Sequence, residues 1–189
     1  EAALLDLPGV FSSVEQYNRM MENGGLEMFQ GYYQEAGLQL LASYAVSFRQ
    51  LSSSRPVDSL EDFQNLYIRT MESAVQSSYW SALGAVAMPL PFSELYFALQ
   101  QGTVAAQENP LYIVISARLY EVQQYLILTN HAPMVTNYVM NQEQYEALSP
   151  EHQELLLRFL QTVQEEELRR LPEEEASQLD QLAREFGME

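Results

Sequence analysis

Short apolar runs alternate with segments of helical periodicity along this chain, and this alternation constrains the fold more than any other feature. Strands are predicted where an apolar run follows a turn signal, at residues 38–46, 66–69 and 103–108. Helices are predicted where apolar side chains recur every three or four residues, at residues 12–36, 73–83, 94–101 and 149–186. Another helix is predicted to begin with Pro110 as its first residue. The order predicts an α/β fold in which helices cover both faces of a sheet.

Capping and turn residues predict where several elements begin. Asp58 is expected to cap a single helical turn, with Glu61 as its capping-box partner. Ser93 is expected to cap the helix predicted at residues 94–101. Pro89 and Pro91 are expected to stiffen a loop before it.

The last forty residues are predicted to be entirely helical. Ser149 is a suitable cap, and Pro172 is expected to break or kink the helix. The side chains predicted to form its buried stripe are Leu155, Leu156, Phe159, Leu160 and Val163. A second stripe is predicted beyond the proline, at Leu179, Leu182 and Phe186.

Composition excludes several kinds of site. The 189 residues include no cysteine and only two histidines, His131 and His152, which lie far apart in sequence, so neither a metal site nor a cofactor is expected. The formal net charge is −17, and all nine cationic residues are arginine. Nucleic acid is therefore an unlikely partner, because the chain has no basic patch to neutralise phosphates.

Two arginines are candidates for anion binding because each follows an apolar or aromatic segment. Arg49 follows AVSF, and Arg69 lies at the end of the predicted strand 66–69. Position alone slightly favours ordinary surface arginines. The alternative is a guanidinium fork for a ligand carboxylate, placed at the carboxyl end of a strand where ligands of open α/β sheets bind.

Three further residues have both a structural and a functional interpretation. Asn109 ends the strand 103–108 before a proline, so it is a turn residue or a side chain that binds a ligand's carbonyl or hydroxyl group. Phe92 is more often loop packing than a pocket wall, and His131 is more often a hydrogen-bonded structural histidine. No catalytic constellation is evident, and the acidic runs at 165–167 and 173–175 are interpreted as a solvated face.

Three blocks of the sequence resemble a known family when taken in order and spacing. They are residues 48–69, FRQLSSSRPVDSLEDFQNLYIR, residues 91–110, PFSELYFALQQGTVAAQENP, and residues 120–131, YEVQQYLILTNH. Together they resemble the extracytoplasmic solute-binding proteins of TRAP (tripartite ATP-independent periplasmic) transporters. The resemblance is strong over residues 7–148 and rests on pattern alone in the terminal helices.

The resemblance implies a two-lobed α/β protein of the type II periplasmic-binding-protein kind, which closes on an organic acid and catalyses nothing. It implies that Arg69 pairs with the ligand carboxylate and that Arg49, Phe92 and Asn109 also line the ligand site. Glu72 departs from the pattern, because some family members have a neutral ligand-contacting residue there. It is expected to repel an anion or to bind a cationic or hydroxyl group of the ligand.

The resemblance also implies a division of the chain. Residues 1–46 are expected to form a first-lobe helix and a hinge strand, residues 47–130 the ligand-clamping second lobe, and residues 131–189 a return hinge strand and helices that pack on the first lobe. The chain is expected to be truncated at both ends, to contain most of the second lobe and parts of the first, and to dimerise through an exposed sheet edge.

The function implied is a periplasmic solute-binding protein that delivers a small carboxylate to TRAP permease subunits in the membrane. A signal peptide is not evident in the chain and is expected to have been removed or truncated. The alternative is a sensor or interaction domain that kept the fold without transport. Thermal stabilisation by a ligand would separate the two.

Overall fold

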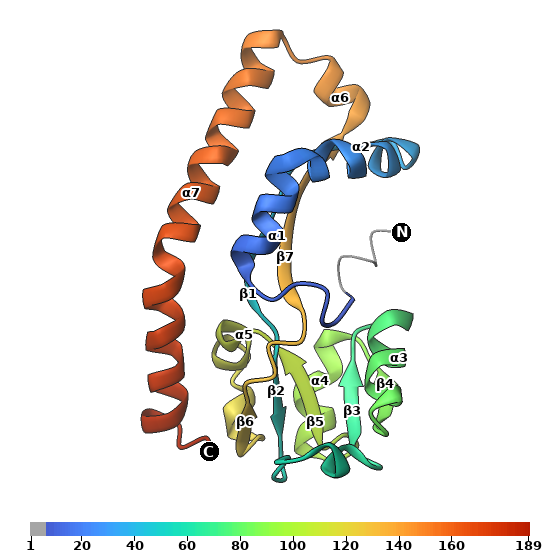
Figure 1. Cartoon of the computed structure of the whole chain (residues 1–189), viewed down its shortest axis with the longest axis vertical. Helices are drawn as coiled ribbons and strands as arrows, with labels where there is room; N and C mark the ends of the chain where they lie inside the picture. The colour runs from blue at the N-terminus through green and yellow to red at the C-terminus, as the bar shows by residue number, and fades with distance from the viewer. Residues whose placement is uncertain (1–6) are drawn as a thin grey trace. The chain divides into compact units, whose positions relative to one another are not determined.

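The computed structural model describes residues 7–189, which form two compact units (Figure 1). Unit 1 contains residues 11–47 and 133–173, and unit 2 contains residues 7–10, 48–132 and 174–189. The long helix α7 (Pro150–Asp180) therefore contributes to both units.

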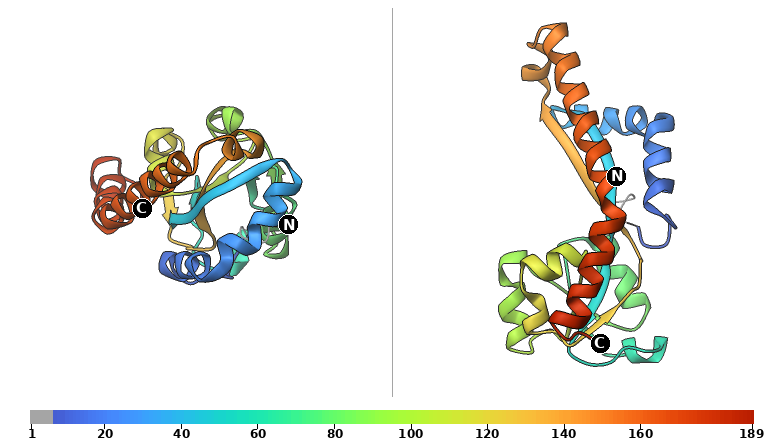
Figure 2. Two further views of the ribbon diagram at one scale, coloured as in Figure 1. Left: turned by 90° about the horizontal axis from the view of Figure 1, so that it is seen from above. Right: turned by 90° about the vertical axis from the view of Figure 1, so that its left-hand side faces the viewer.

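Unit 1 contains a two-stranded sheet, in which β1 pairs with β7. Its elements are α1 (Val14–Met20), a π-helical turn (Met21–Gly25), α2 (Leu26–Glu35), β1 (Leu38–Phe48), β7 (Pro133–Asn141), α6 (Gln142–Glu146) and the first part of α7. Figure 2 shows β1, β7 and α7 from two further directions. Its core is a small apolar cluster that includes Leu41, Tyr44 and Leu160.

The break between α1 and α2 has a local cause in two adjacent glycines. Gly24 has a φ of +102°, which a residue with a side chain rarely adopts. A Cβ on Gly25 would lie 2.7 Å from the carbonyl oxygen of Met20. The predicted helix over residues 12–36 is therefore present but interrupted at the glycine pair.

Side-chain amides bond to the backbone of β1 at two points. Asn18 donates to the carbonyl oxygen of Ala45 (3.2 Å) and accepts from its N–H (2.7 Å). The Gln30 side chain accepts from the N–H of Leu40 (3.2 Å). These bonds satisfy backbone groups of β1 without another strand.

Unit 2 contains a mixed five-stranded sheet in the order β4–β3–β5–β2–β6. The strands are β2 (Gln50–Ser53), β3 (Tyr67–Thr70), β4 (Val86–Pro89), β5 (Ala106–Asn109) and β6 (Tyr125–Ile127). The helices are α3 (Ala74–Ala82), α4 (Phe92–Gln100) and α5 (Leu111–Ser116), with short 3-10 turns at Leu60–Phe63 and Leu119–Glu121.

Helices cover both faces of this sheet. Ile68 and Ala106 pack with Trp80 of α3 in one apolar cluster. Leu95 of α4 and Val114 of α5 belong to a second cluster. Successive strand residues point to opposite faces, and accordingly Ala87 and Ile127 join the first cluster whereas their neighbours Met88 and Leu126 join the second. The predicted α/β fold class is confirmed.

One predicted helix cap is wrong by one residue, and one predicted loop is a strand. Ser59, not Asp58, caps the 3-10 turn, and Asp62 completes the capping box in place of Glu61. The segment ending at Pro89 is a strand rather than a loop, because it pairs in parallel with β3 at the sheet edge, where proline is tolerated.

Two helices also begin one residue away from the predicted position. α4 begins at Phe92, so Ser93 lies within its first turn and is not the cap. Pro110 is the residue before α5 and not its first helical residue. Both shifts fall within the usual uncertainty of helix ends.

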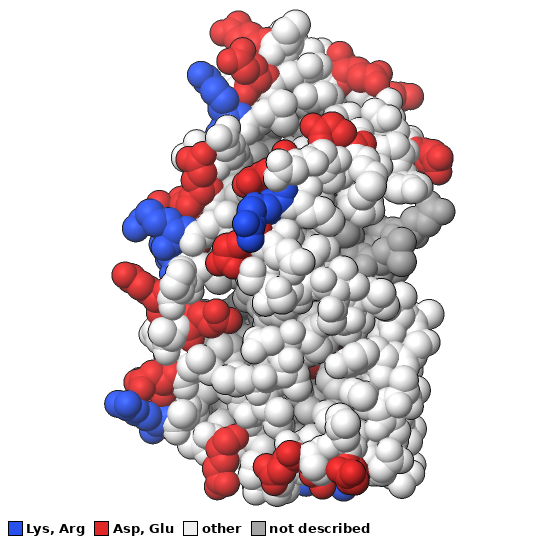
Figure 3. Space-filling model, viewed as in Figure 1, with Lys and Arg blue, Asp and Glu red and all other residues white. Residues whose placement is uncertain are grey.

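Helix α7 differs from its prediction in burial. It continues through Pro172 without ending, and of the predicted first stripe only Leu160 is buried. Leu155 is 53% exposed and Phe159 61% exposed. Figure 3 shows charged side chains of both signs along α7, as expected for a solvated face.

The end of the chain packs in unit 2. Leu182 is fully buried and lies with Met188 in the cluster formed by α4 and α5. The sequence placed residues 131–189 with the first lobe, but residues 174–189 belong to unit 2. Within the described part of the chain, no helix is both long and apolar enough to span a membrane.

Leu182 is buried and Leu155 is half exposed, so replacing them by alanine should lower the free energy of unfolding by different amounts. Leu182→Ala should lower the free energy of unfolding by about 2–5 kcal/mol, because it leaves a cavity in the core of unit 2. Leu155→Ala should change it by less than about 0.5 kcal/mol, because that side chain is half exposed. Urea unfolding of both variants tests this, and equal losses would contradict the packing described.

Candidate ligand-binding site

All five residues predicted to bind a ligand belong to one end of the unit 2 sheet. β3, β4 and β5 run parallel, so their carboxyl ends lie together, and β2 runs antiparallel and begins there. Arg69 lies near the end of β3, and Asn109 ends β5 opposite Gln50, the first residue of β2. Arg49 directly precedes Gln50.

The other two candidates follow strands at the same end. Glu72 lies two residues beyond β3 and just before Ser73, which caps α3. Phe92 begins α4, three residues after β4 ends. Glu72 is exposed, and Phe92 is about half exposed, so both side chains are accessible to a ligand.

The strongest interaction at this end is a buried ion pair between Arg49 and Glu108. The Arg49 Nε donates to Oε2 of Glu108, and one terminal nitrogen of Arg49 donates to Oε1 at 3.0 Å. The same terminal nitrogen also reaches the Glu108 carbonyl oxygen (2.9 Å) and Oδ1 of Asn109 (3.1 Å). The two side chains are 4% and 0% exposed, so the pair is removed from water.

His131 completes the coordination of Glu108. Its Nε2 lies 3.1 Å from Oε2 of Glu108, and its Nδ1 lies 2.9 Å from the Thr129 hydroxyl. Because an ionised carboxylate only accepts hydrogen bonds, Nε2 must carry the proton. The ring also stacks on Tyr79 and meets Trp80 edge-on. His131 is therefore a hydrogen-bonded buried histidine, as favoured from the sequence.

A chain of buried polar side chains extends from the ion pair into the sheet. Asn109 donates to Gln107 (2.6 Å), and Gln107 donates to the Ser52 hydroxyl (2.8 Å). Ser52 in turn donates to Gln123 (3.1 Å). These bonds fix the orientation of the Asn109 amide and leave one of its two N–H groups available.

Arg69 differs from Arg49 in its partners. It is 3% exposed, and its Nε donates to the carbonyl oxygen of Leu90 at 2.9 Å. Among residues 7–189, no hydrogen bond reaches its two terminal nitrogens. Burial lowers the pKa of Arg69, while the negative charge of Glu108 acts in the opposite direction. The four N–H groups of these two nitrogens are therefore available to an anion.

Glu108 and its surroundings were missed in the sequence. A glutamate inside the short strand AQEN gives no periodic signal, although a charged residue between two polar ones in a buried strand is unusual. Burial raises the pKa of Glu108, but Arg49 and the hydrogen bond from His131 together lower it below its ordinary value. The carboxyl group is therefore ionised at neutral pH.

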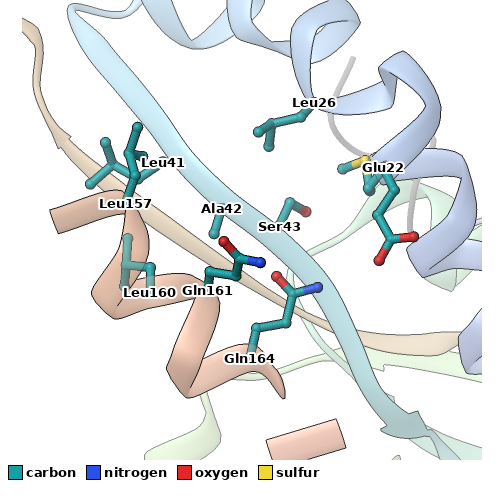
Figure 4. A pocket seen from close by; sticks show the side chains of 10 residues that line it. Glu22, Leu26, Leu41, Ala42, Ser43, Leu157, Leu160, Gln161 and Gln164 are labelled. Carbon is teal, nitrogen blue, oxygen red and sulfur yellow. The ribbon is translucent and has the colours of Figure 1, made fainter. Parts of the chain in front are cut away.

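Two hollows elsewhere do not suit an anion. A cavity of about 160 Å³ in unit 1 lies over β1, between side chains of α7 and those of α2 and the π-helical turn before it (Figure 4). Its polar lining residues are Ser43, Glu22, Gln161 and Gln164, with no cation among them. A hollow along β6 in unit 2 likewise has two acidic lining residues, Asp58 and Glu189, and no cation. Within residues 7–189, no cluster of three or more potential metal ligands occurs.

These features place one available guanidinium at the carboxyl end of an α/β sheet. The sequence matches the family model described as "Bacterial extracellular solute-binding protein, family 7" over residues 1–189. The chain belongs to this family, which includes the solute-binding proteins of TRAP transporters.

Named relatives agree with this assignment. The ectoine-binding periplasmic protein TeaA of Halomonas elongata is 41% identical over 130 residues, which are 69% of this chain and 38% of that protein. The 2,3-diketo-L-gulonate-binding periplasmic protein YiaO of Escherichia coli is 34% identical over 155 residues, which are 82% of this chain and 47% of that protein. The chain thus spans less than half the length of these two relatives.

A solved structure supports the fold. A TRAP periplasmic solute-binding protein from Roseobacter denitrificans with bound L-galactonate superimposes with a TM-score of 0.90 at 32% identity. The match covers 100% of this chain and 63% of that one. The fold class expected from the sequence, a part of a type II periplasmic-binding-protein fold, is therefore confirmed.

The ion pair predicts both a stability loss and a pH dependence. Glu108→Gln should lower the free energy of unfolding by about 3–5 kcal/mol, because the buried charge of Arg49 loses the carboxylate that pairs with it. In the wild type the stabilisation is complete above pH 4.5, the ordinary pKa of glutamate, and is lost as the pH falls through the lowered pKa of the folded state. Urea unfolding between pH 3 and 7 should therefore show a shallower pH dependence for Glu108→Gln than for the wild type.

Glu185→Gln, on the exposed end of the C-terminal helix, is the matched control and should change stability by less than about 0.5 kcal/mol. If Glu108→Gln lowered the free energy of unfolding no more than this control does, the ion pair would not stabilise unit 2. The double variant Arg49→Met/Glu108→Gln should recover part of the loss, because neither charge remains buried alone.

Proposed function

We propose that the protein acts as the solute-binding component of a TRAP transporter in the periplasm. It binds a small organic acid through an ion pair between Arg69 and the ligand carboxylate, and it delivers the acid to permease subunits in the membrane. The protein performs no catalysis in this role. Family membership and the periplasmic names of TeaA and YiaO support the assignment.

The observation that carries the proposal is the state of Arg69. Its Nε is bonded to Leu90, which fixes the plane of the guanidinium, and its two terminal nitrogens have no partner among the described residues. Two parallel N–H donors in a fixed plane match a carboxylate. Because the Nε bond already orients the guanidinium, little further ordering of this side chain is needed on binding.

The neighbouring residues have smaller roles in this proposal. The free N–H of Asn109 donates to a ligand carbonyl or hydroxyl oxygen, and Phe92 supplies apolar contact. Arg49 lines the site, but its charge is already paired with Glu108, so it contributes less than Arg69. Glu72 faces the part of the ligand that is not the carboxylate.

The ligand role predicts a graded loss of affinity. Arg69→Ala should weaken binding at least about 100-fold, because charge-assisted hydrogen bonds contribute about 1.5–3 kcal/mol each. Arg69→Lys should restore only a fraction, since an ammonium cannot form the planar fork. Asn109→Ala should weaken the binding free energy by only about 1 kcal/mol, because it removes a neutral hydrogen bond. Titration calorimetry with small organic acids measures all three.

Arg184→Ala removes an exposed arginine paired with Asp180 and is the matched control, with unchanged affinity expected. The stability of unliganded Arg69→Ala should barely fall, because its side chain makes a single hydrogen bond. Unchanged affinity in Arg69→Ala, or its unfolding, would show that Arg69 is structural and that the carboxylate role is wrong.

The second candidate is a sensor or interaction domain that kept the fold without binding a ligand. A panel of organic acids tested by thermal shift separates the two. A solute-binding protein gains RT ln(1 + [L]/Kd) on binding, or about 2.7 kcal/mol at a hundredfold excess over Kd. A domain that does not bind an acid shows no shift with any of them.

The exposed-edge dimer expected from the sequence stays a prediction. The sheet of unit 1 has only two strands, and α2 and α7 carry exposed apolar residues such as Met28 and Phe159. We therefore expect self-association with rising concentration. Static light scattering that reports a monomer throughout would show that the amides of Asn18 and Gln30 protect β1 sufficiently.

A further inference from the structure

The two arginines of the site are not equally available to a ligand. Arg49 is neutralised by Glu108 through both side-chain oxygens of a buried carboxylate. The negative charge that balances Arg49 is therefore part of the protein. Among the described residues Arg69 has no such carboxylate partner, and the four N–H groups of its two terminal nitrogens make no hydrogen bond. The site in unit 2 consequently offers one guanidinium that is not hydrogen-bonded to a carboxylate of the described residues.

No other cationic side chain of unit 2 lies where it could serve as a second available guanidinium at this site. The chain contains no lysine, so only arginines need to be considered. Arg55 donates to the carbonyl oxygen of Asp62, Arg118 pairs with Glu121, and Arg184 pairs with Asp180. None of these lies at the carboxyl end of β3 and β5.

A second negative charge, that of Glu72, lies at the same end of the sheet as Arg69, between β3 and α3. Glu72 follows β3 three residues after Arg69, is exposed, and acts electrostatically on Arg69. The four charged side chains Arg49, Glu108, Arg69 and Glu72 together balance to zero. A ligand with one carboxylate meets Arg69, whereas a second carboxylate would meet Glu72 without a cation to offset the repulsion.

We propose that this site selects monocarboxylates over dicarboxylates and that Glu72 is the residue that rejects the second carboxylate. The rest of the ligand carries hydroxyl, amide or cationic groups, which Glu72 and Asn109 can bind. This inference rests on the proposed function of Arg69 but names a narrower ligand class. It also assigns Glu72 a role in specificity rather than in affinity for the carboxylate.

The test compares dicarboxylates with their half-amides, which have nearly the same shape and one charge less. Succinate with succinamate and glutarate with glutaramate are suitable pairs, and the thermal-shift panel supplies further acids. Calorimetric titration of the wild type should favour the half-amide at least about tenfold, the size expected for one poorly screened like-charge contact. Glu72→Gln should narrow that ratio several-fold by improving dicarboxylate binding.

Glu185→Gln is again the matched control, since it removes a glutamate outside the site, and it should leave the ratio unchanged. Tighter binding of a dicarboxylate than of its half-amide by the wild type would overturn the inference while leaving the proposed function intact. An unchanged ratio in Glu72→Gln would overturn the role of Glu72. Failure of every acid in the panel to bind would overturn the proposed function and this inference with it.

Discussion

The buried ion pair between Arg49 and Glu108 organises the ligand-binding end of unit 2. It joins the start of β2 to the end of β5, and it holds His131 and Asn109 by hydrogen bonds. Burying either charge alone would cost several kcal/mol, so the two residues must be present together. Their mutual attraction and the surrounding donors offset the dehydration of both groups. The orientation of Asn109 follows directly from this arrangement.

The same pair determines which arginine remains for a ligand. Two guanidiniums lie at one end of the sheet, but the protein supplies a carboxylate for only one of them. Arg69 keeps its charge in a dehydrated setting with its plane fixed by Leu90. In the proposed function this fixed orientation lowers the cost of ordering Arg69 when it binds an anion. This division of roles gives the family fold a specific chemistry at this position.

The sequence predicted what depends on local signals and missed what depends on pairing across the fold. Arg69 and Asn109 became candidates because they lie at predicted strand ends, and the family resemblance then implied their ligand roles, which stay predictions. The α/β class followed from the alternation of short strands and helices. Glu108 gave no local signal, because its role exists only once Arg49 and His131 lie beside it. β4 was predicted as a loop because Pro89 outweighed its pairing with β3. The stripe of α7 at Leu155 and Phe159 had the right periodicity, but no neighbouring element covers these two side chains within the described residues.

Arginine side-chain NMR tests the division of roles between Arg49 and Arg69 most directly. The account predicts that a bound monocarboxylate shifts and slows the exchange of the terminal N–H signals of Arg69, whereas those of Arg49 are protected before ligand is added and change little. Assignment uses Arg69→Lys, which removes one set of signals. If the ligand instead shifted the Arg49 signals and left those of Arg69 unchanged, the claim that Glu108 reserves Arg49 and leaves Arg69 for the ligand would be wrong.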